Sequence, residues 1–88
     1  MKTSKENRIL IFDEAGLQAF AHHMKIVRKE VGITQQQLAF ESGLSLSQIA
    51  RIETARINPT LSTIFAIIRA LEISPCKMFE FELPKLNN

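Results

Sequence analysis

Two stretches of the chain repeat apolar residues every three or four positions, which is the spacing that puts side chains on one face of a helix. The first begins at or shortly after Asp13 and runs to Val31, and the second runs from Leu61 to Leu71. Because Arg69 is the single charge in the second stretch, we expect that helix to be the most buried. The residues expected to face the core are Leu17, Phe20, Met24, Val27, Val31, Leu61, Ile64, Ile67, Ile68 and Leu71.

Helix-start signals divide the chain between Ile33 and Met78. Thr34 and Ser45 are each followed three residues later by a glutamine, Gln37 and Gln48, and this is the capping-box pattern at the start of a helix. Two further helix starts are indicated by a hydroxyl residue beside a proline, at Pro59-Thr60 and Ser74-Pro75. A glycine that can end the preceding helix stands just ahead of each capping box, at Gly32 and Gly43. We therefore predict an all-α fold, a bundle of five short helices between Asp13 and Met78.

The segments that flank this bundle are also apolar. Residues 9–12 include two β-branched isoleucines, and residues 79–83 alternate apolar and acidic side chains, so each could form a short strand. We accordingly divide the chain into an N-terminal extension at residues 1–12, a folded domain at residues 13–79 and a C-terminal tail at residues 80–88. The extension is interpreted as a strand or a dimerisation arm.

Composition favours a single domain in a reducing compartment. A chain of 88 residues with 45% hydrophobic content can bury one core. The single cysteine, Cys76, cannot form an internal disulfide, so we expect a cytoplasmic protein. The apolar run Ile9 to Phe12 is interrupted by Asp13 and Glu14, so we expect neither an export signal nor a membrane span.

The formal net charge of +2 is too small to identify a polyanionic partner. The positive excess lies in residues 24–71, which hold six basic and three acidic side chains. This distribution is compatible with a surface that faces phosphates, and equally with an ordinary mixture of solvated charges. The charge therefore supports a nucleic-acid interpretation only if a motif points the same way.

Residues 35–53 read QQQLAFESGLSLSQIARIE, the pattern of two helices that cross at a tight turn. Ala39 is small where the helices cross, Gly43 permits the turn, and the residues expected in the shared core are Leu38, Leu44, Ile49 and Ile52. This pattern resembles the helix-turn-helix of the λ-repressor/Cro-like family, also called the XRE type. The resemblance extends from Met24 to Phe79 through the segments RKEVGITQQQLA, RIETARINPTL and ALEISPCKMF. It implies a five-helix domain that binds double-stranded DNA.

In that family the second helix of the motif lies in the major groove, so the resemblance implies that residues 45–51 form the site. The residues expected to read bases are Leu46, Ser47, Gln48 and Arg51. The residues expected to hold phosphates are Gln35, Ser45, Arg56 and Asn58. Two alternatives stay open: Gln48 serves only its capping box, and Arg51 is only a solvated surface charge.

The resemblance also implies a structural ion pair, in which Arg28 of the first helix reaches Glu53 at the end of the recognition helix. Three features depart from the family. Glu72 stands where glycine is common, Leu46 is apolar in a position that is usually polar, and residues 1–20 have no counterpart in the minimal domain. The first departure affects a loop, the second affects which bases are read, and the third affects the oligomeric state.

The remaining reactive side chains favour structural roles. His22 and His23 are adjacent, so they point in different directions on a helix, and no acidic or cysteine ligand has a suitable spacing. Cys76 has no positioned histidine or redox partner, which favours simple packing. The aromatic residues expected in the core or in interfaces are Phe20, Phe65, Phe79 and Phe81. We expect no metal, no cofactor and no enzymatic activity, because no nucleophile stands with a base and no glycine-rich loop is present.

The principal interpretation is a homodimeric transcriptional regulator, acting as a repressor on two DNA half-sites about one helical turn (~34 Å) apart. The apolar segments at residues 9–12 and 81–83 would form the dimer interface, or else fold back on their own bundle. The alternative is an antitoxin-like or adaptor protein whose main role is to bind a protein partner such as a toxin. Neither interpretation involves a membrane.

Overall fold

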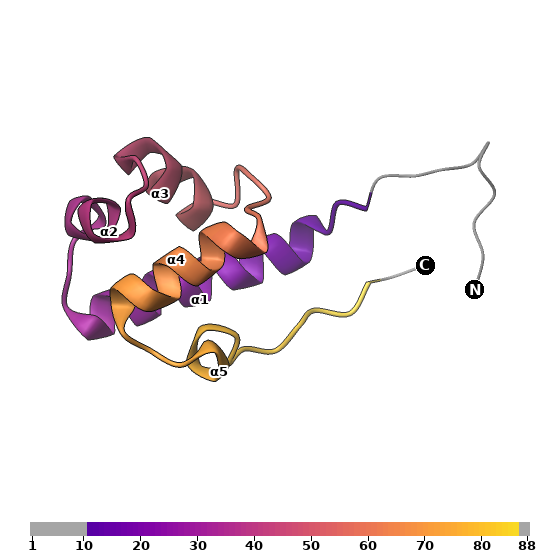
Figure 1. The fold of residues 1–88 in the computed structure, drawn as a ribbon. Helices are drawn as coiled ribbons and strands as arrows, with labels where there is room; N and C mark the ends of the chain where they lie inside the picture. Colours follow the sequence, from indigo (N-terminus) through magenta and orange to yellow (C-terminus); the bar gives the residue numbers. More distant parts are fainter. Residues whose placement is uncertain (1–10, 87–88) are drawn as a thin grey trace.

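The computed structural model describes residues 11–86, and within that range all regular structure is helical. The helices are α1 (Glu14–Val31), α2 (Gln35–Ser42), α3 (Leu46–Glu53), α4 (Leu61–Leu71) and α5 (Pro75–Met78). Figure 1 shows α2 and α3 on one side of α4 and α5 on the other. Helix α2 contacts α3 and α4, while α1 contacts α3 and α5. No helix in the described part of the chain is long and apolar enough to cross a membrane.

Each helix begins at a polar residue whose side chain accepts a hydrogen bond from a backbone N–H in the first turn. These cap residues are Asp13, Thr34, Ser45, Thr60 and Ser74. Both capping boxes close: Gln37 Oε1 accepts from the Thr34 N–H at 2.9 Å, and Gln48 Oε1 accepts from the Ser45 N–H at 3.0 Å. The predicted helix starts are therefore confirmed, because local hydrogen bonding at the caps satisfies N–H groups that have no partner within the helix.

Helices α1, α2 and α4 end in the same way, with a left-handed residue followed by an apolar one. The left-handed residues are Gly32, Gly43 and Glu72, with φ of 92°, 79° and 56°. The residues that follow them are Ile33, Leu44 and Ile73, and each donates its N–H to a carbonyl of the last turn and packs against the core. Glu72 occupies a backbone conformation that suits glycine, the residue that the family resemblance leads us to expect there.

The core lies where all five helices meet. Its fully buried side chains are Met24, Val27, Leu38, Ile49, Ile52, Ile67 and Met78. Two residues predicted to face the core are exposed instead, namely Val31 at 42% and Leu61 at 64%. Val31 is the last residue of α1 and Leu61 the first of α4, so each has a neighbouring turn on one side only. The helical periodicity was correct in the middle of both helices and failed at these two ends.

The segment after α5 forms no strand. Phe79 and Phe81 make a tight turn, in which the Phe81 N–H donates to the Phe79 carbonyl at 2.9 Å. Both rings pack against Phe20 of α1, with centroids 5.6 and 6.2 Å away. Two apolar residues of the alternating pattern, Phe79 and Phe81, therefore pack onto α1, whereas the third, Leu83, is 64% exposed. Of the other possible strand, Ile11 and Phe12 are not in a strand, and Ile9 and Leu10 lie outside the described residues.

Candidate nucleic-acid interface

Helices α2 and α3 cross at a corner of three residues, Gly43, Leu44 and Ser45. Gly43 takes the left-handed conformation, Leu44 turns inward against the core and Ser45 caps α3. Ala39 of α2 is 94% buried, which fits a close crossing of the two helices. The short corner holds α3 in a fixed direction relative to the core.

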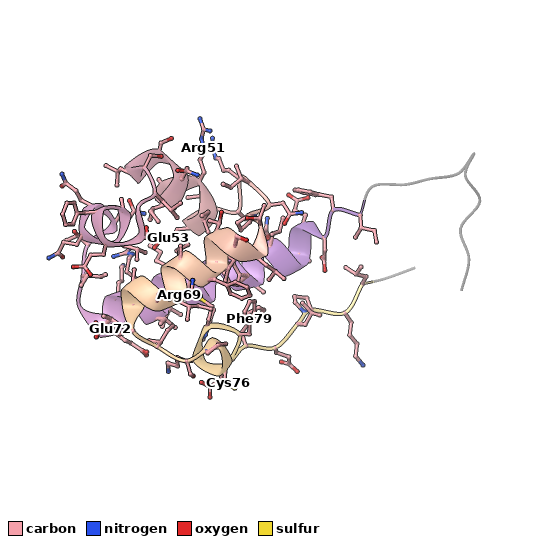
Figure 2. The ribbon with its side chains drawn as sticks, in the orientation of Figure 1. Arg51, Glu53, Arg69, Glu72, Cys76 and Phe79 are labelled. Carbon is pink, nitrogen blue, oxygen red and sulfur yellow. The ribbon has the colours of Figure 1, made fainter. Side chains whose placement is uncertain are left out.

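Helix α3 has one buried face and one exposed face. Ile49 and Ile52 are buried in the core. Four side chains of α3 outside this buried face are exposed, and they are Leu46, Ser47, Gln48 and Arg51. Figure 2 shows Arg51 projecting away from the helical body, whereas Glu53 points back toward it. The four residues predicted to read bases thus share one accessible surface, which we call the recognition face.

The capping box uses part of that surface. Ser45 Oγ accepts from the Gln48 N–H at 3.0 Å, and Gln48 Oε1 accepts from the Ser45 N–H. The alternative role of Gln48 as a capping residue is therefore present in the structure. A carboxamide also carries an Nε2 donor and a second lone pair on its oxygen, so capping leaves Gln48 able to contact a base.

The far end of α3 is held by a buried ion pair. Arg28 Nε donates to Glu53 Oε2 at 2.6 Å, and Arg28 Nη2 donates to Glu53 Oε1 at 3.0 Å. The side chains of Arg28 and Glu53 are only 8% and 1% exposed. Arg28 Nη1 also donates to the carbonyl of Ile33, in the loop before α2, at 2.8 Å. The pair implied by the family resemblance is thus bidentate, and it connects α1 to the end of α3.

Gln35, the first residue of α2, joins the same network. Its Nε2 donates to Glu53 Oε1 at 2.9 Å, so the side chain points at the buried carboxylate. We expected the Gln35 side chain to hold a phosphate, and the sequence carries no signal for this bond, because Gln35 and Glu53 are 18 residues apart. Backbone N–H groups in the first turn of α2 have no partner within the helix, and groups of this kind can bind an anion.

The loop between α3 and α4 brings further polar groups to the α3 side. Arg56 and Asn58 are exposed, and the Arg56 N–H donates to the Arg51 carbonyl at 2.8 Å. Ala55 takes a left-handed conformation with φ of 59°, which lets the chain turn directly after α3. The backbone of Arg56 therefore lies next to that of Arg51, so two exposed cationic residues lie near the end of α3.

Several other residues singled out in the sequence have structural contacts. His23 is half-buried, and its Nε2 lies 2.7 Å from the Lys77 carbonyl, with its ring 5.4 Å from that of Phe81. His22 and Cys76 are exposed, and Phe65 is 43% exposed. The contact of His23 with α5 has no signal in the sequence, since a polar residue on a helix gives no indication of its long-range partner.

A helix-turn-helix with a rigidly held second helix and an exposed polar face defines the class of small DNA-binding domains. Residues 24–78, well over half of the chain, match the family described as "Helix-turn-helix". The chain belongs to this family, which is the XRE-type family suggested by its sequence.

Among curated relatives, the immunity repressor protein of Bacillus phage phi105 is 50% identical over 50 residues, which cover 57% of this chain and 35% of the repressor. Antitoxin HipB of Escherichia coli (strain K12) is 41% identical over 54 residues, which cover 61% of each chain. The matched part therefore spans less than two thirds of the length of these relatives.

Solved structures of restriction-modification controller proteins have a similar fold. C.AhdI from Aeromonas hydrophila has a TM-score of 0.69 and 33% identity, with 72% of this chain and 96% of that chain covered. C.Esp1396I, solved as a tetramer with its natural 35 base-pair operator, has a TM-score of 0.72 and 32% identity, with 77% and 90% covered.

Proposed function

We propose that this protein binds a specific double-stranded DNA sequence through α3 and regulates transcription from it as a repressor. The observation that carries the proposal is the recognition face: four exposed side chains on a helix whose other face and last residue are buried. Recognition requires such rigidity, because side chains must meet base edges in a fixed register. The resemblance to an immunity repressor and to an operator-bound controller protein supports the same role.

Within this function the residues divide by chemistry. Leu46 contacts a thymine methyl group, Gln48 an adenine edge, and Ser47 and Arg51 hydrogen-bond to neighbouring base edges. The first-turn N–H groups of α2, which begins at Gln35, and of α3, which follows Ser45, hold phosphates. Arg56 and Asn58 hold a further phosphate from the loop after α3. The phosphate contacts position the domain, and the base contacts supply sequence preference.

The test is selection of bound duplexes from a random library by the full chain, followed by affinity measurements on the best duplex. Arg51→Ala should weaken binding by about tenfold to a hundredfold, as expected for a lost base contact. Arg69→Ala is a matched control, because Arg69 is also exposed and also lies in the last turn of a helix. It removes the same charge but should change affinity by about twofold or less.

Equal losses in the two variants would mean that Arg51 contributes only general charge. A selection that enriches no sequence would contradict the proposed function itself.

Arg56→Ala should weaken all duplexes alike and reduce the magnitude of the salt slope by about one unit, because one phosphate contact releases about one counterion. An unchanged slope would remove Arg56 from the interface.

We further propose that the protein acts on its operator as a homodimer. A single recognition helix contacts only a few base pairs, so discrimination against many competing sites generally uses two copies on one duplex. This stoichiometry is measured by sedimentation of the protein with a selected duplex. One copy bound per duplex at saturation would contradict it.

A second candidate function is that of an antitoxin-like protein, and the 41% identity to antitoxin HipB favours it. The same domain would then bind a toxin as well as DNA. A neighbouring reading frame whose product arrests growth, with growth restored by this protein, would support that role. A neighbouring product that does not affect growth would contradict the antitoxin-like role and leave transcriptional regulation as the proposed function.

A further inference from the structure

An apolar hollow of about 370 Å³ opens at one end of the molecule. Its walls come from the start of α1, the start of α4 and the tail after α5, and the lining residues include Leu17, Phe20, Leu61, Ile64, Phe81 and Leu83. Figure 1 shows the start of α1 and the tail lying at this same end. An apolar cavity of about 150 Å³ is enough to hold one benzene molecule. The hollow therefore has room for two side chains of the size of leucine.

The chain reaches α1 along the rim of this hollow. Ile11, the first residue that the structure describes, lines the hollow and is 88% exposed. Leu61 of α4 and Leu83 of the tail also line it, and each is 64% exposed. Neighbouring apolar groups of this kind are typical of a surface that something else covers. Ile11 therefore touches the hollow without filling it.

The residues directly before Ile11 are themselves apolar, namely Ile9 and Leu10. A residue spans at most about 3.6 Å of chain, so the Cα atoms of this pair cannot be farther than about 7 Å from that of Ile11. Two aliphatic side chains also match the volume of the hollow. The charges agree, because residues 1–8 hold three basic side chains and one acidic side chain, whereas the charged residue among those that line the hollow is Asp13.

Attachment to the rim gives Ile9 and Leu10 an advantage over any separate molecule. A group held on a short tether has an effective concentration on the order of millimolar. A free apolar ligand or a second copy of the chain at micromolar concentration would have to bind about a thousandfold more tightly to displace it. The same chain is therefore the favoured source of the occupant.

We infer that Ile9 and Leu10 fill this hollow within their own chain and so close the apolar end of the domain. The filled hollow also supports the loop between α3 and α4, because Asn58 and Pro59 of that loop line it. Asn58 is a proposed phosphate-binding residue, so the effect on DNA rests on the proposed function. The packing itself does not require DNA.

The experiment introduces one indole into the full chain, which contains no tryptophan and no tyrosine. Ile9→Trp and Leu10→Trp are measured without DNA from about one to a hundred micromolar, a range in which micromolar association would appear. At least one indole should emit at shorter wavelength and be quenched by acrylamide about twofold less than the indole of Thr3→Trp, because an apolar contact removes it from water. Thr3→Trp is the matched control, since it lies in the same segment but outside the apolar pair.

A second substitution tests whether the hollow is what shields the indole. Leu61→Glu, added to the shielded variant, should return its emission to that of Thr3→Trp, because it puts a charge into the apolar contact. Glutamate at the first position of α4 is compatible with folding, since it faces the positive end of the helix. Phe40→Glu should leave the emission unaltered, because Phe40 is 87% exposed on α2 and does not line the hollow.

Three results would overturn the packing of Ile9 and Leu10 into their own hollow. The first is equal quenching of the three indoles. The second is shielding that Leu61→Glu leaves intact. The third is shielding that appears only as the protein concentration rises, because a second copy would then cover the hollow.

The effect on DNA is measured separately. Replacing both residues, Ile9→Ser with Leu10→Ser, should weaken binding to every duplex by about twofold to fivefold and leave the base preference unchanged, because the loop loses its support but keeps its contacts. Unchanged affinity would contradict the support of the loop. A protein whose indole is shielded but which selects no DNA sequence keeps the packing and loses the proposed function. A protein that selects a sequence while both indoles stay in water keeps the function and loses the packing.

Discussion

The corner between α2 and α3 and the corner between α4 and α5 have the same local design but hold the following helix differently. In each, a left-handed residue is followed by an inward apolar residue and a serine cap. Helix α3 then runs for eight residues to Glu53, which is 1% exposed in its side chain and bonded to Arg28 and Gln35. Helix α5 runs for four residues to Met78, which is buried by apolar packing and has no ion pair, and the residue that follows it, Phe79, is 46% exposed and packs on Phe20.

The difference shows that a corner directs a helix but does not make it a recognition element. Three donors fill the carboxylate of Glu53, two from Arg28 and one from Gln35, and so fix the far end of α3. Aromatic packing at the end of α5 is less directional than such a network. The rigidity required of a DNA-reading helix therefore comes from its last residue as much as from its cap.

The largest expected effect is on the ion pair. Glu53→Ala or Arg28→Ala should each lower the free energy of unfolding by about 3–5 kcal/mol, because the remaining buried charge loses its partner. Phe79→Ala, just after the end of α5, should cost only about 1 kcal/mol, since its ring is half-exposed. Urea denaturation measures all three. Melting temperatures of both ion-pair variants within a degree of wild type would show that the pair does not hold α3.

Gln35 tests whether the network includes α2. Gln35→Ala should cost about 1.5–3 kcal/mol of stability, the value of a hydrogen bond to a charged group. It should leave the salt dependence of DNA binding unchanged, because the backbone N–H groups of α2 remain. Parallel measurements of unfolding and of the salt slope decide the matter. Unaltered stability with a slope reduced by one unit would instead assign the side chain to a phosphate.

Substitution of Gln48 separates its role in the α3 capping box from a role in base recognition. Gln48→Ala should weaken binding to the best duplex by about 1–3 kcal/mol and relax the preference at one base pair. The corresponding residue of α5 is Lys77, whose N–H bonds to Ser74 Oγ in the same way, so Lys77→Ala controls for changes at a capped first turn. Affinities for the full set of single-base variants are the measurement. Uniform weakening on every sequence would leave Gln48 with its cap alone.

The smallest effects on stability are expected from substituting the left-handed residue of each corner, Glu72 in one and Gly43 in the other. Glu72→Gly should raise the free energy of unfolding by about 1 kcal/mol, because glycine adopts positive φ without a steric cost. Gly43→Ala should lower it by about 1 kcal/mol, and only through the backbone, since a Cβ there meets no atom within 4 Å. Thermal melts should move in opposite directions by roughly 4–8 °C. Shifts of the same sign would mean that the two corners are not equivalent.

Much of this fold is predictable from short-range pattern. Thr34 and Ser45 mark helix starts because their partners, Gln37 and Gln48, lie three residues away and the hydrogen bonds are local. Leu38, Ile49 and Ile52 are buried as their spacing requires. The exposed positions of Ser47 and Arg51 follow from the same periodicity, since they lie opposite Ile49 and Ile52, whereas Leu46 and Gln48 are exposed in the first turn of α3.

Contacts between distant residues required the tertiary structure. Gln35 and Ser45 both stand at helix starts, yet only Gln35 turns toward a buried carboxylate, because the packing of α1 and α3 brings Glu53 beside it. The alternating residues after Met78 suit a strand locally, but Phe20 offers two ring contacts that no local rule describes. Local hydrogen bonds and periodicity therefore determine where helices begin and which face is apolar. Which polar groups meet, and where an apolar hollow opens, depends on how the helices pack.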